Sequence, residues 1–90
     1  MGELDGVWAV ERVSGALPPL HGCVKRIHGS RGTTECPNFP RMPFDVRGLE
    51  LHYRGPFALL IDKLERRNGG YLGRATLLGR EFGQFELRKL

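Results

Sequence analysis

The sequence has no long hydrophobic run, which limits how this chain could meet a membrane. Its longest uninterrupted apolar segment, 57–61, has five residues, whereas a membrane-spanning helix needs about 20. The first residues, 1–5, do not combine a basic stretch with an apolar one, so we expect no signal peptide. These two absences predict a protein without a membrane span that resides in the cytoplasm.

Cysteine is scarce, with only Cys23 and Cys36 in the chain. In the cytoplasm both thiols would be reduced, and a disulfide between them would require an oxidising compartment. Together with His21 and His28 they offer thiolate and imidazole groups that would suit zinc. The sequence contains no Cys-x-x-Cys pair or other recognised ligand spacing, however. We therefore predict neither a metal site nor a cofactor.

Residues that would indicate catalysis are also few. Ser14 and Ser30 are the only serines, and neither lies in the Gly-x-Ser-x-Gly turn of the α/β-hydrolases. Asp45, Glu50 and Asp62 are candidate carboxylates, but nothing in the sequence brings two of them together. The sequence therefore predicts no catalytic residue and favours a binding protein over an enzyme.

Glycine and proline, by contrast, are abundant, with 13 and 6 residues in a chain of 90. They interrupt the chain every few residues and leave little room for long helices. A hydrophobic content of 40% is enough for a small core, and the length fits one domain, 1–90. The net charge of +4 is dispersed along the chain. It permits an anionic partner without identifying one.

Short stretches of alternating apolar and polar residues dominate the pattern. In the cleanest, Leu49, Leu51 and Tyr53 alternate with polar residues, as expected of a strand with one buried face. Further candidate strands lie at 6–13, 23–28, 42–47, 71–78 and 82–90. The segment 29–43 is expected to be a long loop, or turns around a short extended piece. Six to seven or more short strands predict an all-β fold, a small antiparallel meander closed or nearly closed into a barrel.

The segment 57–67 fits two secondary structures. Its apolar residues Phe57, Leu60, Ile61 and Leu64 have the spacing of an amphipathic helix. The dipeptide Asn68-Gly69 that follows is a preferred two-residue hairpin turn and would give the strand at 71–78 a neighbour. We favour the strand, and the helix remains the alternative.

Two short motifs resemble the lipocalin-like, or calycin, barrels. Gly6-x-Trp8 opens the first strand, and Arg88 stands near the end of the last. The resemblance implies that Arg88 packs across the Trp8 ring and closes the barrel, a contact that cation–π attraction would favour. This chain is shorter than members of that group. The cavity could therefore be narrow, filled by side chains, or completed by a second subunit in a homodimer.

The resemblance also implies an interior ligand site, so we expect a small apolar ligand or a partner protein. The predicted ligand-binding residues are Trp8, Val10, Phe44, Leu51, Tyr53, Leu59, Ile61 and Phe85. In so short a chain the same side chains could simply fill a solid core. The alternative function is single-stranded nucleic-acid binding, because small barrels stack bases on aromatic rings in a basic groove. The candidate residues for that are Tyr53, Phe57 and Tyr71 with Arg54, Arg66, Arg67 and Arg74.

Overall fold

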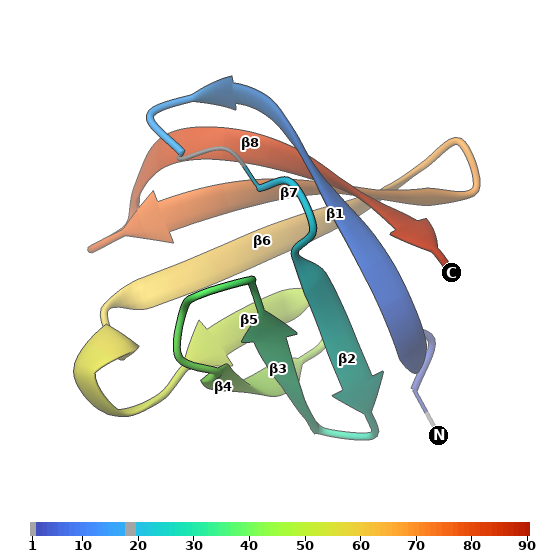
Figure 1. The fold of residues 1–90 in the computed structure, drawn as a ribbon, viewed down its shortest axis with the longest axis horizontal. Helices are drawn as coiled ribbons and strands as arrows, with labels where there is room; N and C mark the ends of the chain where they lie inside the picture. Colours follow the sequence, from blue (N-terminus) through green and yellow to red (C-terminus); the bar gives the residue numbers. More distant parts are fainter. Residues whose placement is uncertain (1, 18–19) are drawn as a thin grey trace.

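The computed structural model describes residues 2–17 and 20–90, which form eight strands and one short 3₁₀ helix (Figure 1). The strands are β1 (Gly6–Gly15), β2 (Val24–His28), β3 (Arg31–Glu35), β4 (Met42–Arg47), β5 (Glu50–Tyr53), β6 (Leu60–Arg67), β7 (Gly70–Leu77) and β8 (Arg80–Lys89). The 3₁₀ helix η1 (Gly55–Phe57) lies between β5 and β6. In the part of the chain that is described, no helix is long and apolar enough to cross a membrane.

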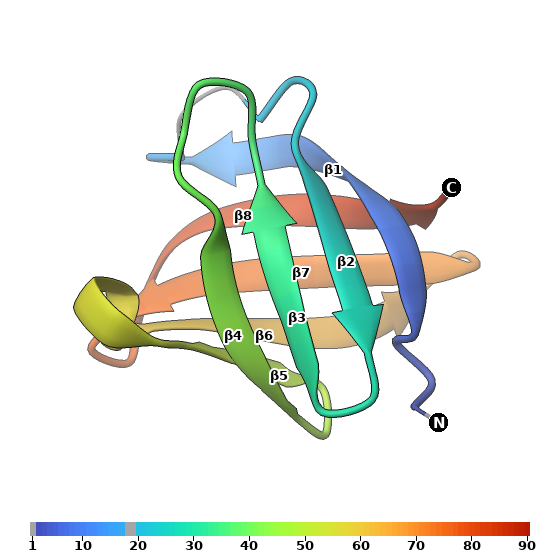
Figure 2. The same cartoon turned by 60° about the horizontal axis from the view of Figure 1, so that its bottom comes forward.

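Each strand pairs antiparallel with the next one along the chain, and β1 also pairs with β8. The sheet therefore closes on itself, which confirms the predicted all-β meander barrel. Closure gives the first and last strands the hydrogen-bonding neighbours that the edges of an open sheet lack. Both chain termini lie at the same end of the barrel, and η1 lies at the other (Figures 1 and 2).

The segment 57–67 is a strand over most of its length, as predicted. Phe57 belongs to η1, and β6 runs over Leu60–Arg67. The turn into β7 contains Asn68 and Gly69, whose φ angles are 48° and 80°. Positive φ at both positions is the signature of the tight turn that Asn-Gly favours, and it matches the twist of the two strands.

The segment 29–43 holds a full strand, where we expected a loop or at most a short extended piece. β3 pairs with β2 along its whole length and with β4 over Arg31–Thr34. Its sequence, Arg-Gly-Thr-Thr-Glu, carries no large apolar side chain, so alternation of hydrophobic residues could not reveal it. Gly32 explains how such a strand contributes to the core. A Cβ added there would lie 2.6 Å from the ring of Phe44 on β4, so the ring rests directly on the glycine backbone.

The barrel half that carries the termini is filled by large side chains. Phe44 and Leu51 are 1% and 0% exposed. Trp8 packs edge-on against Tyr71, with 5.3 Å between ring centroids. The Trp8 Nε1–H donates to the backbone carbonyl of Leu4, which folds across the interior from the chain before β1. This end of the barrel is therefore a solid core.

The cation that closes the barrel over Trp8 is Lys89, and the predicted Trp8–Arg88 pair is wrong by one residue. The Lys89 Nζ lies 5.0 Å from the centroid of the Trp8 ring, and Trp8 and Lys89 are direct cross-strand partners. Arg88 points to the outer surface and pairs there with Glu11. The reason is the period of two along a strand: Leu87 faces the interior, so its immediate neighbour Arg88 must face outward.

Candidate functional site

A cavity of about 620 Å³ occupies the end of the barrel opposite the termini. Its walls combine the interior face of the strands with the connections on either side, and most of the lining is apolar. The lining residues are Val10, Leu17, Leu20, His21, Cys23, Lys25, Thr34, Cys36, Pro37, Phe39, Pro40, Met42, Tyr53, Phe57, Leu60, Asp62, Ala75, Phe82 and Phe85. The volume is within the range of pockets that hold small organic molecules.

Three of the eight predicted ligand-binding residues line this cavity: Val10, Tyr53 and Phe85. The structure places three others, Trp8, Phe44 and Leu51, in the solid half of the barrel. Phe85 owes its place partly to Gly73, its cross-strand partner on β7. A Cβ at Gly73 would overlap the Phe85 ring, so the glycine gives the ring room inside a narrow barrel.

The two remaining predicted residues, Leu59 and Ile61, do not line the cavity. Leu59 is 58% exposed and precedes β6. Along β6 the inward-facing residues are Leu60, Asp62 and Leu64, so Ile61 faces the other way. The prediction that Leu59 and Ile61 face the interior was wrong by one residue. A shift of one residue along a strand moves every side chain to the opposite face.

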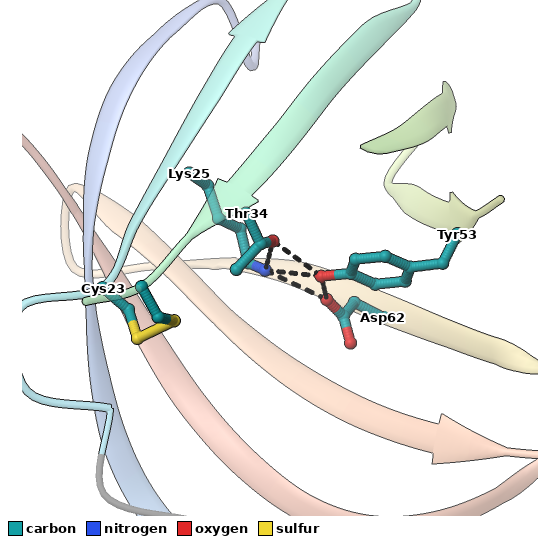
Figure 3. Close-up of a disulfide and its surroundings, with 6 residues drawn as sticks. Cys23, Lys25, Thr34, Tyr53 and Asp62 are labelled. Carbon is teal, nitrogen blue, oxygen red and sulfur yellow. Dashed lines mark hydrogen bonds and ion pairs between the residues drawn. A yellow bond between two sulfur atoms is a disulfide. The ribbon is translucent and has the colours of Figure 1, made fainter. Parts of the chain in front are cut away.

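The floor of the cavity is a compact polar network around the Lys25 amine (Figure 3). Lys25 Nζ donates to Thr34 Oγ1 at 2.7 Å and to Tyr53 Oη at 2.8 Å. It also forms an ion pair with Asp62 Oδ2 at 3.2 Å. Tyr53 Oη donates to the same Asp62 oxygen at 2.8 Å. The four residues come from β2, β3, β5 and β6, so the network joins strands on opposite sides of the barrel.

Aromatic rings surround the same amine. Its nitrogen lies 5.1 Å from the ring centroid of Phe85, 5.5 Å from that of Tyr53 and 5.7 Å from that of Phe44. Lys25 is only 3% exposed, and a buried charge is costly unless it is paired and hydrogen-bonded. The rings and the polar network supply that compensation.

The environment fixes the protonation states of the network. Burial lowers the pKa of the Lys25 amine, but the oxygens of Tyr53 and Asp62 favour the charged ammonium by electrostatic attraction and hydrogen bonding and outweigh it, so the pKa lies above its usual value. Burial raises the pKa of the Tyr53 hydroxyl to about 12, against the opposing pull of Lys25. At neutral pH Lys25 is therefore an ammonium group and Tyr53 a neutral phenol.

Cys23 and Cys36 form a disulfide in the cavity wall. This corrects the expectation of two reduced thiols and matches the alternative that an oxidising compartment would allow. The bond ties the residue before β2 to the one after β3. It also removes both thiolates from the candidate zinc ligands. The connection that follows, with Phe39 68% exposed, forms part of the cavity mouth.

Lys25 and Thr34 were not among the site residues predicted from the sequence, and Asp62 was predicted only as a possible catalytic carboxylate. A signal for two of them was present. Cys23 and Ile27 lie two residues before and after Lys25, so all three side chains share one face of the strand, and Cys23 and Ile27 are both buried. Asp62 likewise stands midway between Leu60 and Leu64. Alternation alone would have put both charges on the interior face.

Comparisons with known proteins found no matching family, no similar curated protein and no similar solved structure. The fold and the cavity are therefore the observations on which a function can be argued.

Proposed function

We propose that this protein binds a small, largely apolar molecule inside the open end of its barrel, as a lipocalin-like binding protein without catalytic activity. The observation that carries the proposal is the division of the interior into two halves. One half is a solid core, and the other is a cavity of about 620 Å³. Small-molecule sites are typically apolar hollows with a few convergent polar groups, and the floor formed by Lys25, Thr34, Tyr53 and Asp62 supplies such groups.

The nucleic-acid alternative has less support. Tyr53 and Tyr71 are each 8% exposed, so neither ring is free to stack on a base. The neighbouring cations are also engaged with carboxylates. Arg54 pairs with Asp45 and Arg66 pairs with Glu3.

A partner protein is a second candidate, favoured by one observation. Leu59, Leu77 and Leu78 are 58%, 44% and 71% exposed. They lie together, because the Leu78 backbone N–H donates to the Leu59 carbonyl and Leu77 is the cross-strand neighbour of Leu60. Exposed apolar patches often mark interaction sites. Light scattering of the purified chain would show whether the partner is a second copy, as the possible homodimer predicts.

The disulfide bears on the compartment in which the protein works. Such bonds persist in oxidising compartments and are rare in the cytoplasm. We infer that the protein functions where Cys23–Cys36 stays oxidised, rather than in the cytoplasm as the sequence alone suggested.

Binding can be tested with Nile red, a neutral apolar dye whose fluorescence rises on leaving water. We expect saturable binding to the wild-type chain and strong loss in Ala75→Leu, which adds volume inside the cavity. Ala58→Leu is the matched control, because Ala58 lies on the exposed surface beside η1. Thermal unfolding of both variants checks that they are folded. Equal dye binding by the two variants would show that the dye binds outside the cavity and would contradict the proposal. Salt-sensitive binding of a single-stranded oligonucleotide would instead favour the nucleic-acid alternative.

A further inference from the structure

The polar hydrogens of the cavity floor are all donated within the network itself. The Lys25 ammonium has three hydrogens: two are donated to Thr34 and Tyr53, and the third is left for Asp62 Oδ2, 3.2 Å away. The one phenolic hydrogen of Tyr53 is donated to Asp62 Oδ2. Thr34 Oγ1 and Tyr53 Oη are also 2.8 Å apart, and because Tyr53 has no second hydrogen, Thr34 must be the donor. Every donor in the floor is therefore already used within it.

One strong acceptor remains. Asp62 Oδ2 receives both contacts to the carboxylate, while Oδ1 receives no hydrogen bond from any residue in 2–17 or 20–90. Figure 3 shows this second oxygen directed away from Lys25 and Tyr53. Within the same residues no sealed side-chain oxygen or nitrogen lacks a partner, so Oδ1 is not sealed. It is reachable from the cavity that Asp62 lines.

We propose that the cavity recognises a neutral hydrogen-bond donor, namely the hydroxyl group of an apolar alcohol, which donates to Asp62 Oδ1. This inference rests on the proposed binding function and specifies its ligand class. A buried lysine below an apolar cavity would ordinarily suggest a fatty acid, but here Lys25 has no hydrogen left to donate. An incoming carboxylate would find no free donor in the floor and no net positive charge to offset the cost of its burial.

A cationic ligand is disfavoured for a different reason. The charges of Lys25 and Asp62 cancel, so the floor has no net negative charge to stabilise an amine. Apart from the neutral Tyr53 phenol, the only other ionisable side chain among the described lining residues is His21, and an imidazole supplies no negative charge. A hydroxyl group needs no counter-charge, and its hydrogen bond to a carboxylate oxygen is of the strong, charge-assisted kind.

The test compares ligands that share one alkyl chain and differ in the head group. Dodecanol, dodecyl methyl ether, dodecanoate and dodecylamine are each used to displace Nile red from the wild-type protein. We expect dodecanol to bind about tenfold more tightly than the ether, which cannot donate, because a hydrogen bond to a charged group is lost. Both charged ligands should bind more weakly than dodecanol. Tightest binding of dodecanoate or dodecylamine would overturn the inference while leaving the binding function intact.

Asp62→Asn sharpens the comparison. Lys25 and Tyr53 still require an acceptor, so the amide oxygen should turn toward them and present its N–H₂ to the cavity. An alcohol and an ether can both accept from that group, so the tenfold ratio should fall close to one. If Asp62→Asn does not fold, the double variant Lys25→Met/Asp62→Leu provides the same loss of the acceptor, and the ratio should again fall. An unchanged ratio of dodecanol to ether affinity in a folded variant would show that Asp62 does not bind the head group of the ligand. If neither Nile red nor any of the four ligands binds, the proposed binding function itself is contradicted.

Discussion

Lys25 and Asp62 form an ion pair across the full width of the barrel. The two residues lie on β2 and β6, which are separated by three strands in either direction around the closed sheet. Their side chains are 3% and 8% exposed. The pair and its hydrogen-bonded neighbours thus divide the interior into a filled half and a hollow half. The same contact that shapes the cavity also ties opposite walls of the barrel together.

The ion pair predicts a non-additive response to mutation. Lys25→Met should destabilise the fold by about 3–5 kcal/mol, because it leaves the buried Asp62 charge without its partner. Lys25→Met/Asp62→Leu should recover most of that loss, since replacing a buried pair by apolar residues is often neutral. Urea unfolding of both variants measures the two free energies. A double variant no more stable than the single one would mean that the pair is not the source of the cost.

Tyr53 predicts a loss of stability at alkaline pH. Its pKa is about 12 in the folded protein against an ordinary value of 10.0. Between these values the unfolded chain releases the phenolic proton and the folded chain does not, so stability is complete below pH 10 and falls as pH rises. The loss should reach about 2 kcal/mol near pH 12. The raised pKa of Lys25 acts in the same direction, because its contribution is lost as pH rises through the folded value.

Urea unfolding at a series of pH values, followed by circular dichroism, measures this effect. Tyr53→Phe should show a shallower alkaline decline than the wild type, although it starts from lower stability. Tyr71→Phe is the comparison, because burial and the hydrogen bond to Glu3 also raise the pKa of Tyr71, but not by the large amount found at Tyr53. Equal declines in the two variants would argue against a special role for Tyr53.

The disulfide predicts a dependence on reducing agent. Cys23 and Cys36 are 13 residues apart in sequence, and closing a loop of that size stabilises a fold by about 3 kcal/mol. Reduction should lower the free energy of unfolding by that order and weaken Nile red binding, because both residues line the cavity. Cys23→Ala/Cys36→Ala should show similar losses with no further response to reductant. A wild type indifferent to reductant would mean that the bond does not form in solution.

Local patterns predicted most of the fold. Alternation at Leu49, Leu51 and Tyr53 identified β5, and Asn68-Gly69 identified the hairpin between β6 and β7. β3 was not identified as a strand because its contribution to the interior is Gly32 and Thr34, neither of them large or apolar. That strand is recognisable only once the Phe44 ring is seen to lie against Gly32.

The candidate site was harder to predict for a physical reason. Charged residues are almost never fully buried unless they are paired. The charges of Lys25 and Asp62 therefore predict exposed positions, although the alternation along their strands places both on the interior face. Their pairing depends on the register of four separate strands, which no local pattern contains. Alternation gives the face of a side chain but not the residue opposite it across a barrel.

Lys89 predicts a sharp contrast with its neighbour Arg88. The Lys89 ammonium lies over the Trp8 ring and donates to the Asp5 carbonyl at 2.6 Å. Lys89→Met should lower stability by about 1 kcal/mol, the scale of an exposed cation–π contact together with one hydrogen bond. Arg88→Met removes only a pair with Glu11 in which both side chains are well exposed, and such pairs contribute little. Thermal unfolding and Trp8 fluorescence should therefore change in Lys89→Met and stay near wild type in Arg88→Met. The reverse order would restore Arg88 as the closing residue that the lipocalin-like motif implies.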